Sequence, residues 1–238
     1  MQNLIIAALD VPTGEKALAL AESLAPVVGA FKIGSELFTA AGPEVVRQIH
    51  RMDATVFLDL KFHDIPNTVA QSVTVATRLG VQMLTVHASG GLAMMQAAET
   101  AARQTAEQLG FKPPLVLGVT VLTSMDREAL GEVGQTTIVA QQVERLANLA
   151  LKAGLRGLVC SPLELAGLRQ SLPAHVQLVT PGIRAAEEDA ADQKRTLSAS
   201  QAIKAGANWL VIGRPIYAAE DPREAVRKIL ASLARTGC

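Results

Sequence analysis

Short apolar segments typical of buried strands recur along the chain and alternate with helical patterns of hydrophobic and polar residues. The strand-like segments are residues 4–9, 29–33, 54–60, 82–87, 115–121, 157–160, 176–180 and 209–213. They are apolar on both faces, as strands of a parallel sheet covered by helices must be. The alternation predicts eight strands and eight helices closing into a (β/α)₈ TIM barrel, one domain over residues 1–238. An open doubly wound sheet is the alternative.

Helix start and stop signals fall between these segments. Ser161-Pro162-Leu163-Glu164 combines an N-cap, a first-turn proline and a capping-box glutamate, and Asp221-Pro222 repeats the start signal. Four glycines stand where a helix should end before the next strand, a position that favours a left-handed residue: Gly80, Gly110, Gly154 and Gly206.

The polar residues that close the strand-like segments are candidates for an active site, because reactive groups of such barrels lie at the carboxyl ends of the strands. These candidates are Asp10, Lys32, Asp59 with Lys61, His87, Thr120 or Thr123, Ser161, Thr180, and Gly213 with Arg214.

Charges concentrate at the end of the third strand-like segment. Side chains alternate along a strand, so Asp59 and Lys61 should face one side while Leu58 and Leu60 face the other. Asp64 follows at the next turn. Two nearby carboxylates favour the ammonium form of a lysine. We therefore expect Lys61 to act as a proton donor and an electrostatic clamp.

Three alternatives for this cluster carry less weight. A purely structural ion network gains little, because desolvation offsets the attraction between buried ions. Magnesium could bind Asp59 and Asp64, but two lysines would compete for those carboxylates. A lysine that forms an imine must react as the neutral amine, which neighbouring carboxylates oppose.

The seventh and eighth strand-like segments end in residues suited to phosphate. Thr180-Pro181-Gly182-Ile183-Arg184 and Ile212-Gly213-Arg214-Pro215 bring glycine amides and two guanidinium groups to the place where barrels hold phosphate. Residues 184–198 form a long acidic segment that we interpret as a lid, with Gln193 as a neutral donor. A solvated surface loop is the alternative.

The histidines and cysteines give weaker signals. We expect His63 and His87 to be hydrogen-bonded rim residues rather than general bases, and we assign no role to His50 or His175. The two cysteines, Cys160 and Cys238, have neither metal-site nor disulfide spacing. They are expected to be inert thiols.

Composition excludes several classes of partner. Lysine and arginine number 22, as do aspartate and glutamate, so the formal charge is zero and nothing attracts nucleic acid or an anionic membrane in bulk. Charges interrupt every apolar run before it reaches the length of a membrane span, and no signal peptide opens the chain. A cytoplasmic location is the resulting expectation.

The run Asp59-Leu60-Lys61-Phe62-His63-Asp64-Ile65-Pro66-Asn67-Thr68 resembles the signature of the bacterial orotidine 5'-phosphate decarboxylase family. Further matching segments extend the resemblance over the whole chain. These are Ala8-Leu9-Asp10, Lys32-Ile33-Gly34, residues 87–91, residues 119–124, residues 179–184, Asp192-Gln193 and residues 212–215.

The resemblance implies a homodimeric barrel that converts orotidine 5'-monophosphate to uridine 5'-monophosphate and carbon dioxide, the last step of de novo pyrimidine synthesis, without a metal or organic cofactor. It implies that Asp10 and Lys32 bind the ribose, and that Lys32, Asp59, Lys61 and Asp64 form the catalytic network. Asp64, Ile65 and Thr68 would reach the partner subunit's site. Thr123 would contact the pyrimidine. The phosphate would be held by Arg184, Gln193, Gly213 and Arg214.

Two rival functions remain at this point. Magnesium-dependent sugar-phosphate lyases share an Asp-x-Lys-x-x-Asp pattern, but carry an acidic residue where this chain has Lys32. A catalytically silent phosphate-binding barrel would have no use for the Lys61 cluster.

Overall fold

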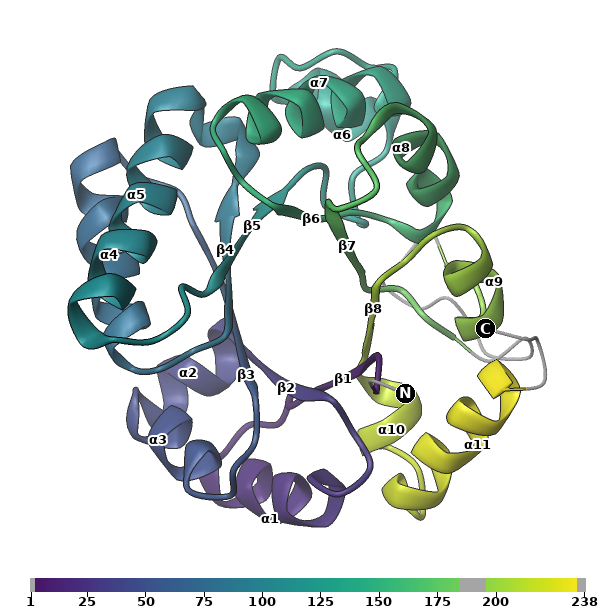
Figure 1. Ribbon diagram of the computed structural model, residues 1–238. Coiled ribbons are helices and arrows are strands. Elements are labelled where there is room, and N and C mark those ends of the chain that lie inside the picture. Colours follow the sequence, from purple (N-terminus) through teal and green to yellow (C-terminus); the bar gives the residue numbers. More distant parts are fainter. Residues whose placement is uncertain (1–2, 185–195, 235–238) are drawn as a thin grey trace.

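The computed structural model describes residues 3–184 and 196–234 and contains a closed barrel of eight parallel strands. The strands are β1 (Ile5–Ala8), β2 (Ala30–Gly34), β3 (Val56–Phe62), β4 (Met83–His87), β5 (Leu115–Val119), β6 (Gly157–Val159), β7 (Gln177–Thr180) and β8 (Trp209–Ile212). Each strand pairs with the next in the sequence, and β1 pairs with β8 (Figure 1). The predicted barrel is confirmed, and the closing pair excludes the open sheet.

Helices surround the barrel on its outer side (Figure 1). They are α1 (Gly14–Leu24), α2 (Ser35–Ala41), α3 (Glu44–His50), α4 (Pro66–Arg78), α5 (Leu92–Leu109), α6 (Arg127–Glu132), α7 (Val139–Lys152), α8 (Leu165–Ser171), α9 (Ala199–Lys204), α10 (Arg214–Tyr217) and α11 (Pro222–Ala234). Short 3₁₀ turns η1 (Ala88–Gly90) and η2 (Pro162–Glu164) follow β4 and β6.

The described residues thus hold eleven α-helices, whereas the sequence pattern predicted eight. Gly42, at φ 64°, ends α2, and Pro43 follows as the N-cap of α3, so one predicted helix becomes two. The other additions, α6 and α10, are short helices in the segments that follow β5 and β8.

The predicted helix signals are confirmed. Ser161 and Glu164 form the capping box of η2, which leads directly into α8. The Asp221 carboxylate accepts hydrogen bonds from the first amides of α11. The four glycines predicted to end helices all have positive φ: Gly80, Gly110, Gly154 and Gly206.

Alternation along the strands divides the buried residues into two cores. The smaller core fills the barrel and includes Ile6, Ala30, Phe57, Met83, Leu117 and Val179. The larger one lies between barrel and helices and includes Ile5, Ile33, Leu58, Leu84, Val116 and Leu178. Inward-facing positions recur at every second residue of a strand. Lys32 and Asp59 stand two residues after Ala30 and Phe57, so they also face inward.

Gly29 lies where β2 begins, against the backbone of the N-terminal segment. A Cβ atom at this position would stand 2.0 Å from the carbonyl oxygen of Asn3. We expect Gly29→Ala to lower the free energy of unfolding by about 2 kcal/mol, because the backbone must shift to relieve the overlap. Denaturant unfolding measures the change.

Gly167 within α8 supplies the control, since a Cβ there would meet nothing within 4 Å. Gly167→Ala should raise stability by about 0.5–1 kcal/mol, the helical preference of alanine over glycine. Equal effects of the two substitutions would contradict this account of Gly29.

Candidate active site

A cavity of about 410 Å³ opens at the carboxyl end of the barrel. Its floor is apolar and includes Ala8, Phe57 and Val211 from the barrel interior. Eight of the residues that the sequence singled out line it: Asp10, Lys32, Asp59, Lys61, Thr123, Arg184, Gly213 and Arg214. The volume suits a small organic ligand, and the mixture of an apolar floor with a few charged groups is typical of ligand sites.

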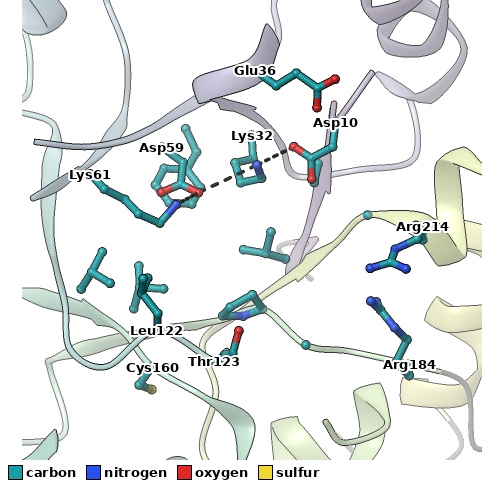
Figure 2. A pocket seen from close by; sticks show the side chains of 18 of the residues that line it. Asp10, Lys32, Glu36, Asp59, Lys61, Leu122, Thr123, Cys160, Arg184 and Arg214 are labelled. Carbon is teal, nitrogen blue, oxygen red and sulfur yellow. Dashed lines mark hydrogen bonds and ion pairs between the residues drawn. The ribbon is translucent and has the colours of Figure 1, made fainter. Parts of the chain in front are cut away.

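Four of these side chains form a chain of alternating charge (Figure 2). Lys61 Nζ lies 2.9 Å from Asp59 Oδ2, which lies 3.8 Å from Lys32 Nζ. Lys32 Nζ in turn donates to Asp10 Oδ1 at 2.8 Å. The two cations and two anions balance, so the network carries no net formal charge.

Burial makes this balance necessary. The side chains of Lys32 and Asp59 are only 10% and 12% exposed, and an ion at such a position is costly unless an opposite charge and hydrogen bonds compensate it. Gly34 gives the Lys32 amine its space, since a Cβ there would stand 2.9 Å from Nζ. Asp10 and Lys61 are more exposed and lie toward the opening.

β3 is less regular than the sequence pattern predicted. It continues to Phe62, so Lys61 lies within the strand rather than beyond its end. Its pairing with β4 shifts register between Leu58 and Phe62, and Lys61 adopts φ 52°. A left-handed conformation outside glycine costs about 1–3 kcal/mol and persists only where the surroundings hold it.

The two guanidinium groups of Arg184 and Arg214 lie across the cavity from the lysine–aspartate network (Figure 2). Arg184 follows β7 and Arg214 begins α10 after β8, so both come from the strand ends that the sequence indicated. Gly213 lies beside Arg214 on the lining. The predicted donor Gln193 and the acidic residues of the predicted lid lie outside the described residues.

Asp64, Ile65 and Thr68 do not line the cavity. All residues from 63 to 68 are exposed, and the Asp64 carboxylate accepts a hydrogen bond from the Ile65 amide. Among the described residues Asp64 makes no ion pair with Lys61. The expectation that Lys61 lies between two aspartates therefore fails within a single chain, because the backbone after β3 directs Asp64 outward.

His63 and His87 lie at the rim with their rings in contact, the centroids 5.5 Å apart. Neither imidazole forms a hydrogen bond among the described residues, so the hydrogen-bonded part of that expectation is not met. The pKa of His87 is lowered, first by burial and then by His63 and Lys61, while Asp59 opposes the shift.

Three strand-end candidates have a structural role instead. Thr120 and Thr180 donate to backbone carbonyls, and Ser161 caps η2; all three are buried. Sequence reasoning also missed several lining residues, among them Glu36, Leu122, Cys160 and Tyr217. Glu36 and Tyr217 belong to short helices that follow strands, where a search restricted to strand ends does not look.

Within residues 3–184 and 196–234, no three or more His, Cys, Asp or Glu side chains come together in a way that could hold a metal ion. No helix in the described ranges is both long and apolar enough to cross a membrane.

The profile of the family described as "Orotidine 5'-phosphate decarboxylase / HUMPS family" matches residues 3–229. The chain belongs to this family. Two relatives named orotidine 5'-phosphate decarboxylase, from Moorella thermoacetica and Pseudomonas fluorescens SBW25, are each 51% identical over 233 residues. These alignments cover 96% and 98% of this chain and 91% and 98% of the relatives. The chain is accordingly an enzyme, a carboxy-lyase.

Solved structures agree with this membership. The structure named orotidine 5'-phosphate decarboxylase from Lactobacillus acidophilus matches with a TM-score of 0.86 and 34% identity, over 97% of this chain and 99% of that one. The structure of the same name from Pyrococcus horikoshii matches with a TM-score of 0.78 over 97% and 99%, and at 24% identity it supports the fold alone.

The lowered pKa of His87 predicts a pH-dependent stability. Below the ordinary value of 6.5 the unfolded state binds a proton that the folded state does not yet bind, so the free energy of unfolding should fall as pH drops. Replacing this histidine (His87→Gln) removes the titrating group and should flatten the decline. Urea unfolding from pH 7.5 to pH 5 measures both curves, and parallel curves would contradict the prediction.

The matched control is His175→Gln, because His175 is exposed and precedes β7, at the opposite end of the barrel from His63 and His87. Its curve should keep the slope of the unsubstituted protein.

Proposed function

We propose that the chain decarboxylates orotidine 5'-monophosphate to uridine 5'-monophosphate and carbon dioxide, the last step of UMP synthesis, with Lys61 stabilising and protonating the intermediate. The observation that carries the proposal is the Lys61 ammonium, bound to Asp59 at 2.9 Å on one side of a cavity with two guanidinium groups on the other. We further propose that residues 1–238 act as one catalytic domain.

The chemistry explains why a fixed ammonium is needed. Loss of carbon dioxide from C6 leaves an electron pair in the plane of the pyrimidine ring, where ring conjugation cannot spread it. A charge held beside C6 stabilises the pair, and the same group then supplies the proton. Lys61 fits both tasks because its amine is anchored by Asp59 yet lines the open cavity.

Asp59 has a second task in the proposed reaction. Its carboxylate would lie near the substrate carboxylate, and their repulsion raises the energy of the bound substrate relative to the transition state. The same carboxylate is already engaged by two ammonium groups and would be a poor magnesium ligand. This engagement argues against a metal ion at Asp59, and we propose that the reaction needs neither a metal nor an organic cofactor.

The remaining lining residues would orient the nucleotide. Asp10 and Lys32 would bind the ribose hydroxyls, and Thr123 would contact the pyrimidine. The phosphate would be held by Arg184, Gln193, Gly213 and Arg214. Guanidinium groups form bidentate, charge-assisted bonds to phosphate, which supports this end of the assignment.

Binding of the distant phosphate must contribute to the rate. Enzymes lower barriers by about 8–23 kcal/mol, and stabilising an in-plane carbanion demands the upper part of that range. One lysine does not supply so much. Phosphate binding can hold the ring against Lys61 and exclude water, which strengthens the charge interactions inside the cavity.

We also propose a homodimer in which Asp64, Ile65 and Thr68 complete the neighbouring site. The exposed position of residues 63–68 directly after β3 supports it. Ile65 is 66% exposed, the largest fraction among the large apolar side chains of the described residues, and this exposure is consistent with burial against a second subunit.

The Lys61→Ala variant should fold and lose at least about 10⁴-fold in kcat, since it lacks both the fixed charge and the proton donor. The decrease in ultraviolet absorbance as orotidine 5'-monophosphate is consumed, measured in EDTA, reports the rate. Lys152→Ala, at an exposed lysine near the end of α7, is the control and should keep full activity. Wild-type turnover by Lys61→Ala, or turnover that stops in EDTA and returns with magnesium, would refute the proposal.

Subunit mixing tests the shared site. Lys61→Ala and Asp64→Ala should each be inactive, whereas a mixed dimer has one site in which both residues are intact. Random exchange makes half of the dimers mixed, so activity should recover to about a quarter of the wild-type value. No recovery after exchange verified by mass spectrometry would rule out the contribution across the interface.

A further inference from the structure

The irregular part of β3 faces a single residue of β4. Phe57 pairs with Met83 and Leu58 with Leu84, but the next recorded pair is Phe62 with Val86. Three residues of β3, from 59 to 61, therefore lie opposite Thr85 alone. A bulge of this kind leaves backbone groups without a partner in the ladder and redirects side chains.

The Thr85 hydroxyl bonds to both functional ends of this bulge. Thr85 Oγ1 donates to Asp59 Oδ1 at 3.0 Å and accepts from the Lys61 amide at 2.9 Å. The direction of these bonds is fixed, because an ionised carboxylate can only accept and an amide can only donate. A hydroxyl makes both bonds at once, whereas a methyl group makes neither.

The two oxygens of Asp59 thereby have separate partners. Oδ1 accepts from Thr85, while Oδ2 faces Lys61 Nζ at 2.9 Å and Lys32 Nζ at 3.8 Å. The hydroxyl of Thr85 thus fixes the backbone of Lys61 and also the carboxylate that holds its amine. Thr85 is fully buried and does not line the cavity.

We propose that Thr85 is the positioning residue that aims the Lys61 amine into the cavity, an inference that rests on the role of Lys61 proposed above. Lys61 keeps its left-handed backbone at φ 52° because the Thr85 hydroxyl satisfies its amide there. Without that bond the lysine relaxes toward extended backbone and its amine moves relative to the substrate. Thr85 touches no substrate and acts through its two neighbours.

The alternative is that Thr85 only fills space between the strands. The two accounts predict opposite orders for two substitutions. Valine keeps the shape of threonine and removes the hydroxyl, so Thr85→Val should be nearly neutral if only packing matters. Serine keeps the hydroxyl and removes the methyl group, so Thr85→Ser should be the better enzyme if the hydrogen bonds matter.

We expect Thr85→Val to lower kcat about 10²-fold with KM changed less than about threefold, as a misplaced reacting group predicts. Thr85→Ser should recover kcat to within about fivefold of wild type, even if its melting temperature is lower. The control is Thr77→Val, which removes another fully buried hydroxyl, one with no hydrogen-bond partner among the described residues. It should leave kcat unchanged.

Hydrogen exchange at the Lys61 amide, followed by NMR, provides a readout that needs no activity. Exchange should be at least about tenfold faster in Thr85→Val than in wild type and restored in Thr85→Ser, while Thr77→Val should leave it unchanged. If Thr85→Val does not fold, Thr85→Ala replaces it in the comparison with Thr85→Ser.

The possible outcomes separate the two proposals. Wild-type kcat and amide exchange in Thr85→Val, with Lys61→Ala inactive, would overturn the role of Thr85 and leave the proposed function standing. A valine variant better than the serine variant would also overturn it. If wild type does not consume orotidine 5'-monophosphate, the proposed function fails, and amide exchange alone decides whether Thr85 holds Lys61.

Discussion

The Asp59 carboxylate is the anion on which the site depends. It is 12% exposed and would be expensive to bury alone, yet it accepts from Lys61 and Thr85 and has Lys32 within 4 Å. These partners come from three neighbouring strands, β2, β3 and β4. The site therefore exists only while the three strands keep their register. A change in the pairing of these strands would also change the geometry of the charges.

The barrel also sets the distance between the lysine–aspartate network and the two guanidinium groups. Strands β2 and β3, with Asp10 after β1, supply the lysine–aspartate network, and the segments after β7 and β8 supply the guanidinium groups on the other side of the opening (Figure 2). A rigid ring of paired strands holds these two ends apart without a dedicated support. A nucleotide that binds at both ends is consequently positioned by the fold itself, and the apolar floor contributed by the barrel core keeps the space between them free of competing charge.

Much of the fold could be predicted because strands buried on both faces leave long apolar segments in the sequence. The same logic placed Lys32, Asp59 and Lys61 at one opening, since a polar residue closing such a segment has few other reasons to be there. Thr120, Ser161 and Thr180 show the limit of that rule. Their hydroxyls bond to backbone groups where the strands end, so a polar residue at a strand end also serves the backbone.

The register of β3 against β4 could not be predicted, because pairing between strands is a tertiary property. Thr85 stands between Leu84 and Val86 and gives a weak signal as a polar, inward position in a strand whose other residues before His87 are apolar. Its hydrogen bonds to Asp59 and to the Lys61 amide depend on the bulge opposite it, in which Lys61 is left-handed. Likewise, the outward direction of Asp64 depends on how the chain turns after β3, which the spacing of charged residues does not encode.

The balance of charge connects the network to the proposed reaction. Asp10, Lys32, Asp59 and Lys61 sum to zero, so a substrate carboxylate entering beside Asp59 adds an anion that the network does not neutralise. In that proposed reaction the charge would move, as carbon dioxide leaves, from the carboxylate to C6, away from Asp59 and toward the Lys61 ammonium. The interaction of this charge with the protein would then improve along the reaction coordinate, which is the condition for catalysis rather than tight substrate binding. A further carboxylate from a second subunit would increase the repulsion of the substrate carboxylate and the attraction on the ammonium together, so completing the site by dimerisation would strengthen the same effect.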